Sequence, residues 1–406
     1  MRWEDWSRLE EAAKAAKVVL EQPSQDLAMA GLEFFVACAV KEESQEDPNG
    51  LIISVQLLML AVELKRSDTE LLQRLEGVAA VSARVSLRAE LRSCAPATPG
   101  LAALREAVSV AWSKGQELGD SCRWELAISM FECAHRILEP LDAAPKGDLA
   151  VARLQEIWAA RAWCLALDAS ARIQQAKGLS TTADRSALLQ RACENLKAAY
   201  RLRRDSEKVS AEGVDQSRRL FIVLVLVEFE AKCLAGETEE HLQQFVDQAS
   251  SHEALGFNSL LAMSKIAAAS SYRRLARHCL QSYVRVRAGT RGAMDFKQVL
   301  PAYREMVVLQ SSRNDSFRLF EGVWSILSQH PGDDLASLGL EEEAAWLIAK
   351  SWNTGAHFYR LQLYRYAESW LSKSMTFAQM FKGLPGLPSH ESMAEGYRLC
   401  LKHCST

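Results

Sequence analysis

The chain has 406 residues, of which 49% are hydrophobic and 24% charged, and its formal net charge is −3. This composition is that of a globular protein with ample core, which excludes a disordered or fibrous chain. The small net charge points to neither a nucleic-acid binder nor a membrane binder. The longest purely apolar run, residues 220–227, is far shorter than the ~20 residues of a membrane span.

The first residues and the cysteines bear on where the protein resides and on metal binding. The first residues, Met1-Arg2-Trp3-Glu4, are charged and do not resemble a signal peptide. The ten cysteines include no CxxC pair, which predicts buried, reduced thiols. A cluster near the end, Cys400 with His403 and Cys404, shares one helix face but is a poor metal site. We therefore expect a soluble intracellular protein without metal or cofactor.

Helical periodicity begins near the N-terminus. It predicts helices over residues 6–20, 27–40, 51–64 and 71–91. Ser67 and Glu70 have the spacing of a capping box before the fourth helix. Pro96, Pro99 and Gly100 then interrupt the pattern, so residues 1–95 are expected to form an N-terminal helical layer.

From residue 101 the predicted helices come in pairs. They cover residues 102–118 with 124–138, 149–176 with 187–202, 217–234 with 239–249 around Gly236, 258–276 continuing into 278–286, 296–310, 315–328, and 340–361 with 366–381. Residues 101–381 are thus expected to form a solenoid. Residues 389–406 are expected to form a C-terminal capping helix, with Ser389 as its N-cap, that covers the open end of the stack.

One segment could be a strand. Residues 222–227 are rich in β-branched side chains, which favour sheets. The charged residues on either side follow a helical pattern, however, and no second strand candidate is present to pair with it. A buried helix is the preferred interpretation, and the fold class is predicted to be all-α.

Two stretches of the chain share one spacing of small and aromatic residues. The first has Trp112, Gly115, Trp124, Ala127, Phe131 and Ala134, with Pro140 following; the second has Trp352, Gly355, Tyr364, Ala367, Leu371 and Ser374. This is the spacing of a tetratricopeptide hairpin, in which glycine and alanine sit where two helices approach closely. The offset of 240 residues is near seven repeats of ~34 residues. It predicts a tetratricopeptide-like solenoid with a right-handed superhelix.

No catalytic motif is present. The sequence contains no GxxxxGK[ST], HExxH or GxSxG pattern, and its eight histidines do not cluster with acids. We therefore expect a non-enzymatic protein that binds other proteins.

A basic segment between Lys265 and Lys297 has two interpretations. Its arginines are Arg273, Arg274, Arg277, Arg285, Arg287 and Arg291, and with Asp295 as its single acid the segment carries a net charge of +7. With Tyr272 and Tyr283 interleaved, it would bind nucleic acid or an acidic peptide. Alternatively, it is a solvated helix face whose arginines pair with acids on neighbouring repeats.

The Gly355 hairpin carries the sharper binding candidate. An asparagine just before the glycine, Asn353, would point into the groove of the solenoid and bond a partner's backbone. Trp352 would anchor an apolar side chain, and His357 lies in the same hairpin. Alternatively, Trp352 packs in the core, as expected for Trp112, and His357 is an ordinary surface or packed histidine.

The same hairpin carries a resemblance to a known family. The segment Trp346-Leu-Ile-Ala-Lys-Ser-Trp352-Asn353-Thr-Gly355, followed by Tyr364-x-x-Ala367-Glu368-x-Trp370, resembles the meiotic Spo-twenty-two/Zip-four family, which includes the testis-expressed protein eleven of animals. The Gly115 hairpin resembles an earlier block of that family. The resemblance covers only part of the chain, and family members are usually much longer. This chain would then be a short relative or an incomplete gene product.

The resemblance implies a nuclear, chromosome-associated scaffold for meiotic recombination, crossover and synapsis proteins. It also implies that Trp352 and Asn353 dock a partner from the synaptonemal complex. Two alternatives remain open. One is a tetratricopeptide adaptor of another intracellular complex, and the other is a helical-repeat nucleic-acid binder that uses residues 265–297.

Overall fold

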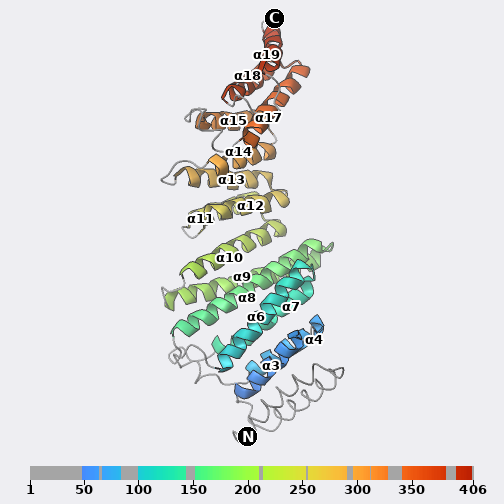
Figure 1. Ribbon diagram of the computed structural model, residues 1–406, viewed down its shortest axis with the longest axis vertical. Helices are drawn as coiled ribbons and strands as arrows, with labels where there is room; N and C mark the ends of the chain where they lie inside the picture. Colours follow the sequence, from blue (N-terminus) through green and yellow to red (C-terminus); the bar gives the residue numbers. More distant parts are fainter. Residues whose placement is uncertain are drawn as a thin grey trace. The chain divides into compact units, whose positions relative to one another are not determined.

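The computed structural model describes residues 48–63, 66–83, 99–142, 151–209, 214–252, 255–289, 296–310, 312–327, 341–380 and 390–404. Fifteen α-helices and no β-strand lie in these ranges (Figure 1). Within this part of the chain the predicted all-α helical solenoid is confirmed, because the described helices of each unit pack on helices that are near them in the chain. The hand of the predicted superhelix stays a prediction.

The helices group into two compact units, Met1–Ala235 and Gly236–Thr406. This boundary falls inside the range 101–381 that was expected to be one solenoid. It separates the two helices of the hairpin predicted around Gly236, whose φ is 77°. The expected ranges 1–95, 101–381 and 389–406 stay predictions, and the helices predicted over residues 6–20 and 27–40 lie outside the described residues.

The described helices of the first unit stack as pairs. They are α3 (Pro48–Glu63), α4 (Asp68–Ser82), α6 (Pro99–Asp120), α7 (Trp124–Asp142), α8 (Val151–Gly178), α9 (Thr182–Val209) and α10 (Val214–Ala235). Helix α6 packs on α7, α7 on α4 and α8, and α8 on α9 and α10. Pro99 occupies the first turn of α6, where a missing amide costs no hydrogen bond. Pro140 lies inside α7, near its end, whereas the sequence suggested that the repeat stops there.

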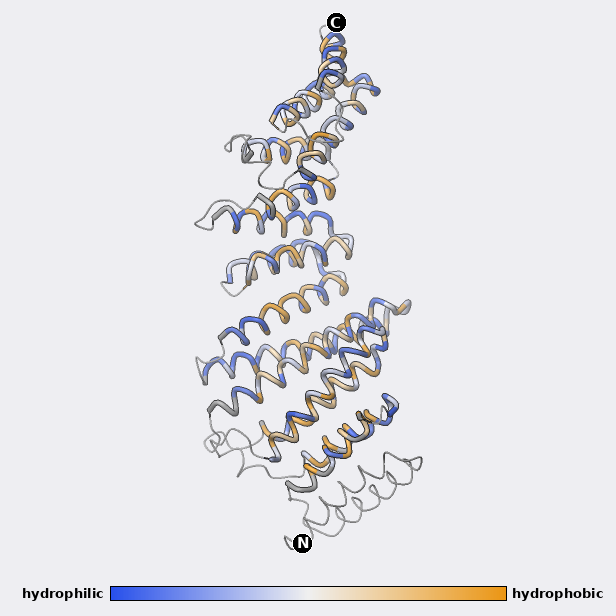
Figure 2. The backbone as a smooth tube through the Cα atoms, in the orientation of Figure 1, coloured by the Kyte–Doolittle hydropathy of each residue, from blue (hydrophilic) through white to orange (hydrophobic). Residues whose placement is uncertain are grey.

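The run of β-branched residues 222–227 is helical. It lies in the middle of α10, which Figure 2 shows as a continuous apolar stretch between polar ends. Leu224 and Val225 are buried, and α10 packs against α8 and α9. Ile222, Val223 and Leu226 are half-buried. The preference for a helix over a strand is therefore confirmed.

The second unit continues the pairing. Its described helices are α11 (Glu239–Ser250), α12 (Phe257–Ala269), α13 (Arg273–Gly289), α14 (Phe296–Leu309), α15 (Arg313–Leu327), α17 (Glu341–Arg360), α18 (Tyr364–Met380) and α19 (His390–Cys404). The closest pairs are α12 with α13 and α17 with α18, and α19 packs on α18. A core of Phe320, Trp370 and Phe377, in edge-to-face contact, joins α15 to α18.

Three helix pairs are joined by the same three-residue turn. Its middle residue has a positive φ, which is 59° at Cys122, 67° at Ser271 and 59° at Gln362. The next amide donates to the carbonyl five residues earlier, from Arg123 to Leu118 over 2.8 Å, from Tyr272 to Ala267 over 2.9 Å and from Leu363 to Phe358 over 3.0 Å. This Schellman arrangement satisfies the last carbonyls of the first helix and reverses the chain at once.

The shared turn reveals a hairpin that the sequence analysis did not separate. Seven residues before the positive-φ residue stand Gly115, Gly355 and, in the pair α12–α13, Ser264. The following repeat positions in that pair are Ala276, Leu280 and Tyr283, each at most 1% exposed. The predicted single helix over residues 258–276 is therefore wrong, because the turn at residues 270–272 divides it. Serine in place of glycine concealed the repeat.

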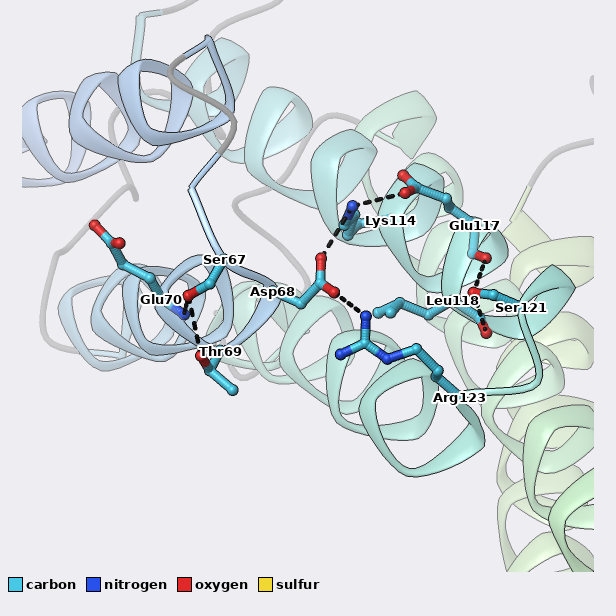
Figure 3. A network of polar contacts seen from close by, with 9 residues as sticks. All are labelled: Ser67, Asp68, Thr69, Glu70, Lys114, Glu117, Leu118, Ser121 and Arg123. Carbon is cyan, nitrogen blue, oxygen red and sulfur yellow. Dashed lines mark hydrogen bonds and ion pairs between the residues drawn. The ribbon is translucent and has the colours of Figure 1, made fainter.

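The fourth predicted helix, residues 71–91, is described as α4 and ends at Ser82. Ser67 caps its start, accepting a hydrogen bond from the Glu70 amide over 3.3 Å. The next residue, Asp68, forms ion pairs with Lys114 of α6, over 3.0 Å, and with Arg123 of the α6–α7 turn (Figure 3). The hydrogen bond from Lys114 is the main cause that lowers the pKa of Asp68. The start of α4 is thereby fixed to the neighbouring hairpin.

Candidate protein-interaction site

The Gly355 hairpin is closely packed where the sequence placed its small residues. A Cβ built on Gly355 would lie 2.7 Å from Cγ of Leu371, so a larger residue would push α17 and α18 apart. Ala367 is fully buried, and Oγ of Ser374 donates to the carbonyl of Ile348 over 2.9 Å. The hairpin is therefore a rigid platform for whatever its outer face carries.

The Gly115 hairpin repeats this packing. A Cβ on Gly115 would lie 2.6 Å from the ring of Phe131, and Ala127 and Ala134 are fully buried. Serine or glycine at this position, with alanine twelve residues later, is what allows the two helices of each hairpin to approach.

Trp352 packs against the next helix. The six-membered ring of its indole lies 3.1 Å from the position that a Cβ on Gly396 of α19 would take. The equivalent Trp112 also reaches forward along the chain, since its Nε1 donates to Sγ of Cys164 in α8 over 3.2 Å. The structure thus gives Trp352 a contact between successive elements. Its anchoring of a partner stays a prediction.

Asn353 and His357 lie on the outward face of α17. Both side chains are exposed, and their spacing of four residues places them on one stripe of the helix. Thr354 lies beside them, and its Oγ1 donates a hydrogen bond to the carbonyl of Lys350 over 2.7 Å. Asn353 and His357 are therefore exposed together on one stripe of α17, and their role in binding a partner stays a prediction.

The last turn of α19 closes against the α17–α18 turn. The ring of His403 stacks on Tyr364 at 5.0 Å between centroids and meets Tyr359 edge-on at 5.7 Å. Sγ of Cys400 donates to the carbonyl of Tyr364 over 3.7 Å. Cys400 and His403, which share a helix face as expected, are used in packing α19 onto the hairpin.

The arginines of the basic segment in α13 are partly half-buried and partly exposed. Arg277 donates to Gln310, while Arg287 lies 4.0 Å above the ring of Phe257 and donates to Gln298. The exposed members, Arg273, Arg274 and Arg285, make no ion pair with any described residue. Arg291 lies outside the described residues. Of the two interpretations, the pairing of these arginines with acids on neighbouring repeats is not found in the described part.

A buried polar network in the first unit was missed by the sequence analysis. Asp168 of α8 is 3% exposed and accepts a hydrogen bond from Nδ2 of Asn195 in α9. Nε of Arg172 lies 2.9 Å from Oδ1 of Asp168, but its direction does not make a hydrogen bond, and Arg172 also pairs with Glu132 of α7. Burial raises the pKa of Asp168 to about 7. The sequence did contain a signal for this network, because Asp168 and Arg172 stand four residues apart in a largely apolar stretch.

Two of the buried thiols are held in the protonated form. Burial raises the pKa of Cys164 to about 12 and that of Cys133 to about 11, so neither is a thiolate at neutral pH. Among the described residues no group of three or more His, Cys, Asp or Glu side chains is arranged to hold a metal ion. No helix in the same ranges is both long and apolar enough to cross a membrane.

Comparison with known proteins gives no family assignment. No protein-family model matches the chain, and no curated protein matches it at a significant level.

Proposed function

We propose that this protein is a non-enzymatic scaffold that holds other proteins together during meiotic recombination and chromosome synapsis in the nucleus. The observation that carries the scaffold part is the exposed stripe of Asn353 and His357 on a closely packed hairpin. A preorganised helix face of this kind binds with little loss of conformational entropy. The meiotic setting is supported by the resemblance of residues 346–370 to the Spo-twenty-two/Zip-four family.

We propose no enzymatic role, and the positions of three groups with strongly raised pKa values support this. Asp168, Cys133 and Cys164 are all inside helix contacts, and their pKa values are raised by that burial. Groups that serve catalysis are usually perturbed within a cleft that a substrate can enter. These three groups instead lie in the packing of α7, α8 and α9.

The experiment is affinity purification of the tagged full chain from meiotic cells, with wild type beside Asn353→Asp. We expect recombination and synapsis proteins with the wild type, and loss of one of them from the variant. The matched control is Ser113→Asp, because Ser113 is the exposed residue at the same position of the Gly115 hairpin. Recovery of trafficking or ubiquitin-pathway proteins instead would replace the meiotic proposal by the general adaptor.

A further inference from the structure

The turn between α17 and α18 exposes three apolar side chains, and none of them has an exposed apolar counterpart in the two matching turns. Leu361 and Leu363 are 51% and 43% exposed, and Tyr366, just inside α18, is 51% exposed. At the position of Leu361 the other turns have Ser121 and Ser270. The backbone is the same in all three turns, so the turn geometry does not require these leucines.

Helix α19 extends the exposed apolar area. The stacking of His403 on Tyr364 brings its last turns beside the α17–α18 turn, and Leu399, one helical turn before His403, is 49% exposed. We call Leu361, Leu363, Tyr366 and Leu399, with the basic residues around them, the terminal turn surface. It combines side chains from three helices of one compact unit.

Four basic residues belong to this surface, and the exposed acid Glu395 stands three residues before one of them, Arg398. Arg360, Arg365, Arg398 and Lys402 are all exposed, and none forms an ion pair with a described residue. The acid at the start of α18, Glu368, already accepts a hydrogen bond from the hydroxyl of Tyr397 over 2.9 Å. At the Gly115 turn, by contrast, the exposed Arg123 is neutralised by Asp68 of a neighbouring helix.

We propose that the terminal turn surface binds an acidic amphipathic segment of a partner protein. Leucine and tyrosine side chains would bury the apolar side of that segment, and the four cations would meet its carboxylates. The proposal rests on the scaffold function proposed above, and it names a second contact in addition to Asn353.

A protein segment fits better than a lipid or nucleic-acid surface. Leu399 and Leu401 lie on opposite flanks of Cys400, which points inward, so α19 presents no single apolar face to a membrane. Single-stranded nucleic acid binds through aromatic stacking, whereas three of the four apolar residues here are leucines.

The test is selection of a random peptide library, displayed on phage, against the full chain, followed by titration of the best peptide. We expect the selected peptides to combine acidic with apolar residues. We also expect Leu361→Ser and Arg365→Glu each to weaken binding about tenfold, because the first removes apolar area from the contact and the second replaces a cation by an anion. Both changes introduce residues found at these positions in the Gly115 hairpin, Ser121 and Glu125, so the turn should still fold.

Two matched variants control for general surface effects. Val308→Ser removes an apolar side chain that is 63% exposed on α14, and Arg285→Glu reverses an exposed arginine on α13 that has no ion pair with a described residue. Binding should be unchanged in both.

The proposal is overturned if no acidic peptides are enriched, or if all four variants bind the peptide like the wild type. It is also overturned if phosphatidylserine vesicles, but not peptides, bind in a way that depends on Leu361 and Arg365. If these results occur while the purification still recovers meiotic proteins that require Asn353, the scaffold stands and only the second contact is lost.

Discussion

The indole nitrogen of Trp112 donates a hydrogen bond to Sγ of Cys164, 3.2 Å away in the next helix pair. Its counterpart Trp352 reaches in the same direction along the chain, to Gly396. The tryptophan three residues before the repeat glycine therefore connects one hairpin to the element that follows it. Both tryptophans make this forward contact, although one contacts a cysteine and the other a glycine.

Loss of the Trp112 bond should destabilise the first unit. We expect Trp112→Phe to lower the stability of the α6–α8 contact by about 1 kcal/mol, which is the typical net contribution of one hydrogen bond, with a further loss of packing. Hydrogen exchange of the α8 amides measures this directly. Amides of α17 and α18, in the other compact unit, should keep their protection. Uniform loss across both units would contradict the local role.

Closely packed and open glycines should respond in opposite ways to alanine. Gly115→Ala and Gly355→Ala place a methyl group less than 3 Å from Phe131 and Leu371, so each should cost about 1–3 kcal/mol through overpacking. Gly77→Ala, in the interior of α4, meets nothing within 4 Å and should stabilise by about 0.5–1 kcal/mol. Thermal unfolding of the three variants checks the sign, and equal effects would show that the close approach is not real.

Glycine at the positive-φ turn positions should make the protein more stable than the residues now present there. Ser271→Gly and Gln362→Gly remove a left-handed strain of about 1 kcal/mol, so we expect a modest rise in the midpoint of thermal unfolding. Ser271→Val should lower it, because a β-branched residue is poorly accommodated at positive φ. A drop with glycine would mean that the serine side chain makes a contact worth more than the strain.

The buried carboxyl of Asp168 should make the stability of the first unit depend on pH. Burial raises its pKa to about 7, against Arg172 and Arg191, which lower it, and together with Glu132, which raises it. Because the unfolded side chain loses its proton near pH 4, the folded state holds more protons between about pH 4 and pH 7. The free energy of unfolding should therefore fall as pH rises through this window and level off above it.

The matched variant for this pH effect is Asp168→Asn. It keeps a group that can hydrogen-bond to Asn195 but removes the titration, so its unfolding free energy between pH 4 and pH 7 should be flatter than that of the wild type. Urea titrations at pH 5 and pH 8 are sufficient. If wild type and variant change in parallel, another group carries the pH dependence.

Much of the helical framework could be predicted from the sequence, because a helix is encoded by local periodicity. The Ser67 cap, the buried helix over residues 222–227, and the glycine and alanine positions of two hairpins follow from residue types a few positions apart. The hairpin of α12 and α13 could not be predicted in this way. Ser264 replaces the repeat glycine, and the residue with positive φ is Ser271 rather than a glycine, which would have indicated a turn.

For the candidate site, the sequence indicated exposure of Asn353 by its place before Gly355, but it left two readings for Trp352. Only the tertiary structure shows what Trp352 contacts, because the packing of an indole depends on the helix beside it, and Gly396 of α19 is 44 residues further along the chain. The same holds for Asp168, whose hydrogen-bond donor Asn195 lies in α9, and for the arginines of α13, of which some are half-buried and others exposed. Local sequence determines which face of a helix is apolar; the packing of distant helices determines which of its side chains remain available to a partner.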